Sequence, residues 1–118
     1  MEFIEAPFFT KLLAEYLSDD EYRELQLDLA RDPEAGDVIQ GTGGFRKVRW
    51  ADSRRGQGRR GGLRVVYFYF EQDRQIWFLT LYAKADATDL TSKEKRALKA
   101  AIEEEKRQRA RRRVLRRK

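Results

Sequence analysis

Apolar residues recur at spacings of three and four in two consecutive segments near the N-terminus, and this pattern predicts helices over 8–17 and 19–31. Ser18 and Glu21 form the S-x-x-E pattern of a capping box, in which each side chain bonds a backbone N–H group at the start of the second helix. The preceding residues 2–5 place apolar Phe3 among polar neighbours and predict a short strand. The chain therefore begins with a strand and two amphipathic helices.

The middle of the chain is rich in aromatic and β-branched residues bounded by glycine, which is typical of strands. We predict strands over 44–50, 63–70 and 75–84. The polar sequence EQDR separates the last two and has the length that closes an antiparallel hairpin. Residues 32–44 hold a proline and four glycines and are predicted to be a connector, with a few extended residues near 38–39.

A second capping box, formed by Thr91 and Glu94, precedes a narrow apolar stripe and predicts a helix over 92–107 or beyond. Two Glu–Arg pairs four residues apart, 103 with 107 and 105 with 109, would prolong it past the last core residue. The remaining residues 108–118 are mostly arginine, and we expect this basic tail to be frayed or disordered in the unbound protein. The predicted fold is one α+β domain over 1–107. In it, two N-terminal helices pack on a small antiparallel sheet of three to four strands, and a C-terminal helix follows.

The amino-acid composition narrows the chemistry available to this chain of 118 residues. It contains no cysteine and no histidine, which excludes disulfides, thiolate zinc sites, a cysteine nucleophile and an imidazole base. We expect no metal and no cofactor, because the carboxylates crowded at 19–24 suit a helix N-terminus better than a metal site. The acidic start MEFIEA and the short longest apolar run, Val65–Phe70, lead us to expect a cytoplasmic protein with no membrane segment.

Charge is distributed very unevenly along the chain. Residues 1–37 carry a net charge of −8 and residues 106–118 a net charge of +9. Between them, residues 44–64 hold eight Arg or Lys side chains and a single acid, Asp52, so that this segment alone exceeds the +6 of the whole chain. Such a concentration of cations predicts a polyphosphate partner, because Arg and Lys contacts to phosphate supply most non-specific affinity for nucleic acid.

Strand alternation groups some of these cations. Lys47 and Arg49 are two residues apart on one predicted strand and therefore share a face. Lys84 is separated from Arg64 by an even number of residues, which brings the two to the same face if no bulge intervenes. Tyr82 has the same parity and is the candidate for proton transfer. Four cations and one tyrosine are thus predicted to converge on one face of the sheet.

Such a cluster suits metal-independent cleavage of RNA. The 2′-OH of the substrate attacks the adjacent phosphorus, while the protein orients it, stabilises the negative charge that develops and moves protons. Two alternatives stay open: the same cations could bind nucleic acid without cleaving it, or could form a solvated face. The remaining arginines of the basic segments are predicted to dock RNA or the ribosome, and they are Arg46, Arg54, Arg55, Arg59, Arg60, Arg111, Arg112 and Arg113.

The segments GDVIQGTGGFRKVRW, GRRGGLRVVYFYF and IWFLTLYAKADATDLT, in this order of predicted elements, resemble the RelE/HigB superfamily of bacterial toxins, and the HigB-type branch most closely. The resemblance covers about residues 3–105. It implies a RelE-like fold and a ribosome-dependent endoribonuclease that cleaves mRNA in the A site and leaves a 2′,3′-cyclic phosphate. It also implies neutralisation by a partner antitoxin, expected to be a HigA-like helix-turn-helix protein.

The superfamily's site cations fall here on four residues, which are Lys47, Arg49, Arg64 and Lys84. The RelE branch also uses a tyrosine shortly after the last of these cations, but residues 85–91 contain none, which leaves Tyr82 or a lysine as the substitute. The basic tail extends beyond the superfamily's core and is expected to contact ribosomal RNA, or operator DNA or the antitoxin in a repressor complex. Two other functions remain alternatives: a non-enzymatic RNA- or ribosome-binding protein, and a ParE-like inhibitor of DNA gyrase.

Overall fold

The computed structural model describes residues 1–51, 62–86 and 89–117. The chain forms two compact units. The larger comprises Met1–Val38 and Phe45–Thr88, and the smaller comprises Ile39–Gly44 and Asp89–Lys118. Four predicted docking residues of the glycine- and arginine-rich loop lie outside the described residues, and they are Arg54, Arg55, Arg59 and Arg60.

The larger unit is built on a five-stranded sheet in the order β1-β5-β4-β3-β2. The strands are β1 (Glu2–Glu5), β2 (Asp37–Val38), β3 (Arg46–Trp50), β4 (Leu63–Phe70) and β5 (Gln75–Ala83). The α+β class with its two N-terminal helices and C-terminal helix is confirmed. The sheet is larger than the predicted three to four strands and is mixed, because β1 pairs with β5 in parallel while all other pairs are antiparallel.

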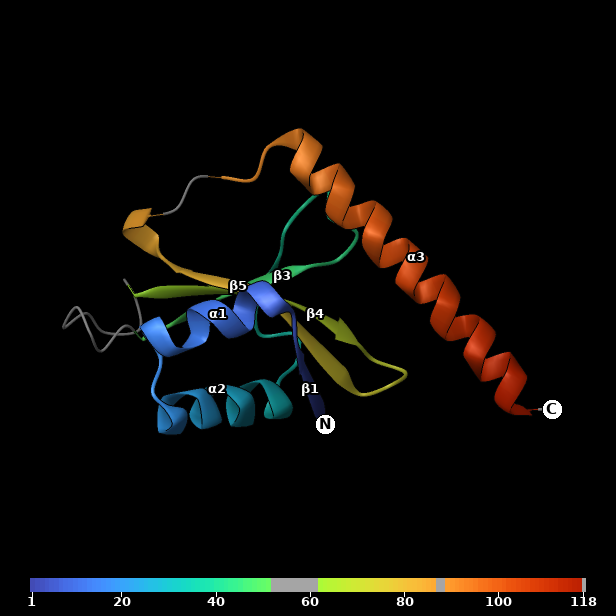
Figure 1. Cartoon of the computed structure of the whole chain (residues 1–118), viewed down its shortest axis with the longest axis horizontal. Helices are drawn as coiled ribbons and strands as arrows, with labels where there is room; N and C mark the ends of the chain where they lie inside the picture. Colours follow the sequence, from blue (N-terminus) through green and yellow to red (C-terminus); the bar gives the residue numbers. More distant parts are fainter. Residues whose placement is uncertain (52–61, 87–88, 118) are drawn as a thin grey trace. The chain divides into compact units, whose positions relative to one another are not determined.

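Helices α1 (Pro7–Tyr16) and α2 (Asp19–Arg31) follow β1 in the chain and run beside each other against the sheet (Figure 1). The predicted capping box is present: the Ser18 hydroxyl accepts from the Glu21 N–H at 3.2 Å, and Glu21 Oε1 accepts from the Ser18 N–H at 2.9 Å. Pro7 occupies the first turn of α1, where its missing N–H costs no hydrogen bond.

The apolar sides of the two helices cover one face of the sheet, which we call the back face; the opposite face is the front face. Phe78 lies at the centre of the back face and its ring stacks on Phe3 and Phe9, with centroids 5.8 Å and 4.7 Å apart. Burial of one such ring contributes about 1.5–3 kcal/mol. The sheet residues of this core are Trp50, Leu63, Val65, Tyr67, Ile76, Phe78, Leu81 and Ala83.

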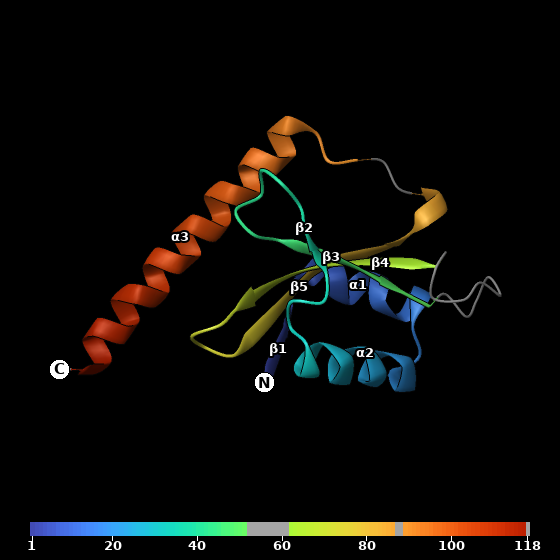
Figure 2. The ribbon, with the colours of Figure 1, turned by 180° about the vertical axis from the view of Figure 1, so that it is seen from behind.

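The β4–β5 hairpin contains a β-bulge that decides which residues face forward. Close to the turn, Phe70 pairs with Gln75 and Tyr67 with Phe78, whereas beyond the bulge Val66 pairs with Thr80. One residue of β5, Leu79, is therefore skipped. The strands are seen from the other side in Figure 2.

The smaller unit contains α3 (Ser92–Arg117), which begins with the predicted capping box: Thr91 N–H donates to Glu94 Oε1 at 2.8 Å. The expectation of a disordered tail is wrong, because α3 runs through residues 108–117 as one helix. Ion pairs within the helix explain its length: Glu104 bonds Arg107 at 2.7 Å and Glu105 bonds Arg109 at 2.9 Å. Such pairs at spacings of three and four each stabilise a helix by about 0.2–0.5 kcal/mol.

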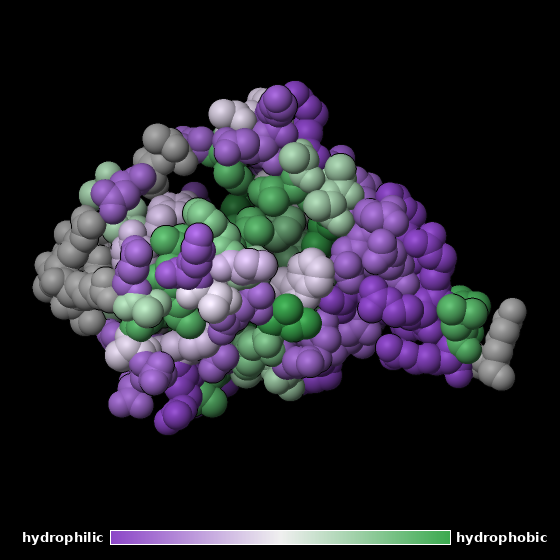
Figure 3. Space-filling model, viewed as in Figure 1, coloured by the Kyte–Doolittle hydropathy of each residue, from purple (hydrophilic) through white to green (hydrophobic). Residues whose placement is uncertain are grey.

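On the side seen in Figure 3, α3 is mostly hydrophilic, with an apolar spot close to its C-terminal end. That spot coincides with Val114 and Leu115, whose side chains are among the exposed large apolar residues. The loop Ile39–Gly44 contacts the same helix. A Cβ added at Gly43 would lie 2.9 Å from Cγ2 of Ile102, and the φ angle of +78° also favours glycine there.

No helix in the described part of the chain combines the length and apolar character that crossing a membrane requires.

Candidate functional site

Three predicted site residues form a row across the front face of the sheet. Arg49 of β3 pairs directly with Arg64 of β4, and Arg64 pairs with Tyr82 of β5. Directly opposite residues of antiparallel strands project from the same face, and neighbouring strands lie about 4.8 Å apart. The register therefore puts Arg49, Arg64 and Tyr82 on one face of the sheet in adjacent positions, the grouping that strand parity predicts.

The reason for this convergence differs from the one that the sequence suggests. Close to the hairpin turn, partners differ by an odd number of residues, as Phe70 and Gln75 do. Without the bulge, Arg64 would pair with Leu81, and Tyr82 would project from the back face. The sequence argument assumed that no bulge interrupts these strands, and this assumption is wrong. The bulge is what brings Tyr82 to the same face as Arg64.

Lys47 belongs to the next row along the strands, two residues from Arg49 and on the same face. Its partners in the register are Val66 on one side and Asp37 of β2 on the other. Asp37 was not among the predicted site residues. The signal that could have found it is the predicted extended stretch at 38–39, because pairing of that stretch with the next strand places a carboxylate beside one of the cations.

The members of these rows differ in exposure. Arg49 and Asp37 are exposed, Lys47 and Tyr82 are half-buried, and Arg64 is only 8% exposed. Arg64 Nη1 donates to the Leu63 carbonyl oxygen at 3.3 Å. Since a guanidinium has five N–H donors, this bond occupies only one of them.

Lys84 is the first residue of a short 3-10 helix, η2 (Lys84–Asp86), which directly follows β5. Its N–H still donates to the Gly62 carbonyl oxygen at 3.1 Å, one step beyond the last strand pair. The backbone of Lys84 is therefore held at the end of the sheet where Arg64 and Tyr82 lie. Its side chain is exposed.

The pairing of Arg49 with Arg64 is unfavourable for folding. Directly opposite like charges destabilise a sheet, by roughly the 0.2–1 kcal/mol that opposite charges contribute at such positions. Binding an anion such as a phosphodiester between the two guanidinium groups would reverse the sign of this interaction. The row of Arg49 and Arg64 therefore carries the charge that an anionic ligand requires.

The other half of the front face, nearer the β4–β5 turn, is aromatic. Phe68 contacts Phe45 and Phe70, with ring centroids 5.4 Å and 4.6 Å apart, and Phe70 contacts Trp77 at 5.1 Å. Phe45, Phe68 and Phe70 are all buried. These rings are consequently engaged with one another, and a role in stacking RNA bases is not needed to explain them.

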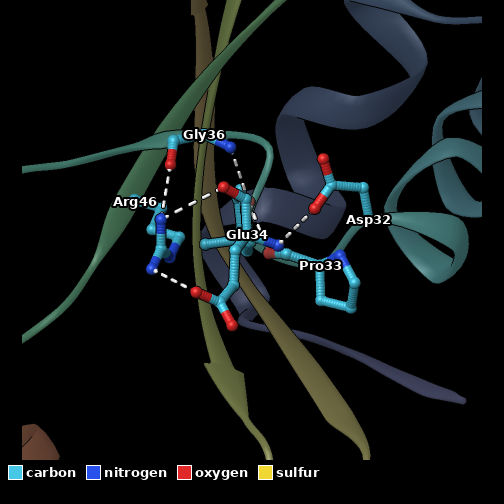
Figure 4. A network of polar contacts seen from close by, with 6 residues as sticks. Asp32, Pro33, Glu34, Gly36 and Arg46 are labelled. Carbon is cyan, nitrogen blue, oxygen red and sulfur yellow. Dashed lines mark hydrogen bonds and ion pairs between the residues drawn. The ribbon is translucent and has the colours of Figure 1, made fainter.

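Arg46 lies on β3 between the front-face cations but projects from the back face, where it pairs in the register with Tyr67. Its guanidinium donates to the Gly36 carbonyl oxygen at 2.8 Å and to the Glu34 carbonyl oxygen at 3.2 Å (Figure 4). It also forms an ion pair with the Glu34 carboxylate at 3.2 Å. The structure thus separates Arg46 from Lys47 and Arg49, with which its sequence position groups it.

Tyr67 belongs to the same back-face network. Its hydroxyl donates to the Pro33 carbonyl oxygen at 2.7 Å and accepts from the Gly36 N–H at 3.0 Å. Burial raises the pKa of Tyr67, so the phenol remains protonated and able to donate.

The predicted docking arginines of the C-terminal segment lie on α3. Arg111 pairs with Glu104 at 3.6 Å and Arg112 with Glu105 at 3.4 Å, yet both side chains stay more than half exposed. Arg113 is half-buried. Among the described residues, no three His, Cys, Asp or Glu side chains are grouped as metal binding would require.

A family model described as the RelE toxin of the RelE / RelB toxin-antitoxin system matches residues 9–114. The match includes every predicted site residue of the sheet and of α3.

Proposed function

The chain belongs to the RelE toxin family of toxin–antitoxin systems, and from this premise we propose that it is a ribosome-dependent endoribonuclease that cleaves mRNA and so inhibits translation. Within the family we assign it to the HigB-like branch, on the resemblance of its strand segments. The observation that carries the proposal is the row Arg49, Arg64 and Tyr82 on the front face.

The proposed reaction uses the RNA's own 2′-OH as the nucleophile. Its oxygen forms a bond to the adjacent phosphorus while the bond from phosphorus to the 5′ oxygen breaks, which yields a 2′,3′-cyclic phosphate and a free 5′-OH. Arg49 and Arg64 stabilise the charge that develops on the non-bridging oxygens. Removal of one such donor in other enzymes lowers the rate by about 10²–10³.

Proton transfer is needed at both ends of this reaction. The 2′-OH must lose a proton, and the Asp37 carboxylate opposite Lys47 is an acceptor within the second row. The 5′ oxygen must gain one, and we assign its donation to the Tyr82 hydroxyl, because Tyr82 is the register partner of Arg64. Lys47 and Lys84 add positive charge at the same end of the sheet, which favours binding of the phosphodiester.

The proposed partners follow from this activity. A ribosome-dependent toxin acts on mRNA and ribosomal RNA in the cytoplasm, and we propose a HigA-like helix-turn-helix antitoxin as its inhibitor. Arg111 and Arg112, which are exposed, and the half-buried Arg113 are proposed to dock RNA along α3. Operator DNA, reached through the toxin–antitoxin complex, is a further proposed partner of these arginines.

Primer extension on mRNA from cells that express the chain tests the proposal. We expect cuts within translated codons for the wild type, none for Arg64→Ala, and unchanged cuts for the control Arg31→Ala, whose side chain is exposed on α2. Intact transcripts during growth arrest would contradict the proposal and favour a gyrase inhibitor. Ribosome binding without cuts in any variant would favour a non-enzymatic RNA-binding protein.

A further inference from the structure

One polar network on the back face joins the residues that precede Asp37 and Lys47 (Figure 4). Gly36 precedes Asp37, and Arg46 precedes Lys47. The Gly36 N–H donates to Tyr67 Oη at 3.0 Å, and the Gly36 carbonyl oxygen accepts from Arg46 Nη1 at 2.8 Å. Both backbone polar groups of Gly36 are therefore bonded to side chains of β4 and β3.

The same two side chains also hold the turn before Gly36. Tyr67 Oη donates to the Pro33 carbonyl oxygen at 2.7 Å, and Arg46 bonds both the carbonyl oxygen and the carboxylate of Glu34 at 3.2 Å. The Tyr67 side chain is fully buried, so burial shields its own two bonds from competition with water, whereas the bonds between Arg46 and Glu34 are exposed. We call Tyr67, Arg46 and the bonded segment 33–36 the back-face clamp.

The clamp matters because β2 is too short to hold its own position. It has only two residues, lies at the edge of the sheet and pairs with β3 alone. Ordering each residue costs about 1–2 kcal/mol of conformational entropy, which a two-residue ladder does not offset. Anchoring from outside the ladder is required, and the clamp supplies it immediately before Asp37.

The fit at Gly36 is also sterically tight. A Cβ added there would lie 3.0 Å from the carbonyl carbon and oxygen of Lys47 and 3.1 Å from Cε1 of Tyr67. These distances are shorter than ordinary van der Waals contacts, so any side chain would push β2 away from β3 at Lys47. Backbone placement at Gly36 and at Lys47 is thus coupled directly.

We propose that Tyr67 and Arg46 are positioning residues for RNA cleavage: acting from the back face, they fix β2 against β3 and thereby hold Asp37 and Lys47 in place on the front face. This inference rests on the proposed endoribonuclease function. In this proposal Arg46 fixes the positions of Asp37 and Lys47 and does not contact RNA, although its place in the sequence suggests such a contact.

Single-turnover cleavage of an end-labelled mRNA on programmed ribosomes tests the clamp. We expect Tyr67→Phe, which removes one hydroxyl and keeps the ring, to lower the cleavage rate at saturating protein by at least about fivefold. The protein concentration that gives half-maximal rate should change by less than about twofold, because the clamp touches no RNA. Arg46→Gln should likewise lower the rate at saturating protein and leave the half-saturating concentration nearly unchanged. Substitution of an arginine that docks RNA would instead change mainly the half-saturating concentration.

Tyr69→Phe is the matched control, because Tyr69 is the next back-face tyrosine of β4 and packs against the core without belonging to the clamp. Its cleavage rate should stay within about twofold of the wild type. Gly36→Ala offers a test that removes no polar group, and we expect it also to lower the rate at saturating protein. It serves as the deciding variant if Tyr67→Phe fails to fold.

Combining Tyr67→Phe with Arg46→Gln shows whether the two residues act as one unit. Since both hold Gly36, the double variant should lose clearly less than the product of the two single losses. Independent, multiplicative losses would overturn the inference, as would a smaller than fivefold loss for Tyr67→Phe. If the wild type cleaves nothing, the proposed function fails and the clamp proposal fails with it. If the wild type cleaves and the clamp variants cleave at the same rate, the clamp proposal alone fails.

Discussion

Arg46 and Arg49 lie three residues apart on one strand, carry the same charge and have opposite surroundings. Arg46 projects from the back face, where two carbonyl oxygens and a carboxylate bond its guanidinium. Arg49 projects from the front face, is exposed, and lies directly opposite a second arginine, Arg64. Two arginines of equal charge on one strand thus differ in face and exposure, and only the exposed one lies beside a second cation in the register.

The two faces of the sheet differ in the same way. On the back face, stacked rings such as Phe9 and Phe78 and the bonded Tyr67 stabilise the fold. On the cationic half of the front face, like charges oppose each other across neighbouring strands. We therefore expect substitutions of core residues on the back face to reduce stability and substitutions on the cationic half of the front face to reduce cleavage directly. The back-face clamp is the exception, because it acts on cleavage through Asp37 and Lys47.

The largest effect on stability is expected for Phe78→Ala on the back face. Loss of this fully buried ring should lower the free energy of unfolding by about 3–5 kcal/mol. Urea unfolding followed by circular dichroism measures the change, and Phe8→Ala is the control because Phe8 is 62% exposed. A loss below about 1 kcal/mol would contradict the assignment of Phe78 to the centre of the core.

The largest effect on cleavage is expected for Arg64→Ala on the front face. The single-turnover rate on programmed ribosomes should fall by about 10²–10³, which corresponds to about 3–4 kcal/mol. Arg31→Ala on α2 removes an exposed arginine and should leave the rate unchanged. The distinction between the two faces would fail if Arg64→Ala changed only stability.

A smaller effect, confined to binding, is expected for the arginines of α3. Replacing Arg111, Arg112 and Arg113 together by glutamine keeps good helix formers and removes three charges. If each contacts a phosphate, the slope of log affinity for ribosomes against log salt should become shallower by about 2–3. The cleavage rate at saturating protein should be retained, and its loss would place these arginines with Arg64 instead.

The smallest effect is expected for the stability of Arg49→Gln. Removing one of two opposed cations should raise the free energy of unfolding by about 0.2–1 kcal/mol, while cleavage falls. Thermal and urea unfolding at low salt measure the gain, and high salt should reduce it because the repulsion is screened. If Arg49→Gln instead lowered the free energy of unfolding, other interactions of Arg49 in the fold would outweigh its repulsion with Arg64.

Local patterns in the sequence predicted much of the fold. The two capping boxes lie where the S-x-x-E and T-x-x-E spacings placed them, and the hairpin of β4 and β5 closes at the predicted polar turn. These features depend on residues within one turn of helix or one strand pair. The spacing of Glu105 and Arg109 predicted that the last helix would continue past its apolar stripe, and this ion pair is present. The expectation of a frayed or disordered tail is wrong, because α3 continues to Arg117.

The candidate site was predictable only in part. Strand alternation grouped Lys47 with Arg49, since both are on one strand. The register puts Arg49, Arg64 and Tyr82 in one row, although the condition on which parity grouped the cations, the absence of a bulge, does not hold. The register itself depends on the bulge at Val66 and Tyr67, which no local pattern shows. Asp37 escaped notice for a similar reason, because its neighbour Lys47 is ten residues away along the chain.

By itself, the sequence determined the helices, the main strands, the absence of histidine and cysteine chemistry, and the cluster of cations in the middle of the chain. Only the tertiary structure decided which face each cation occupies and which partners it has: Arg46 bonded on the back, Arg49 and Arg64 opposed on the front. The physical reason is that helix capping and alternation arise from neighbours in sequence, whereas strand register is fixed by pairing between distant segments.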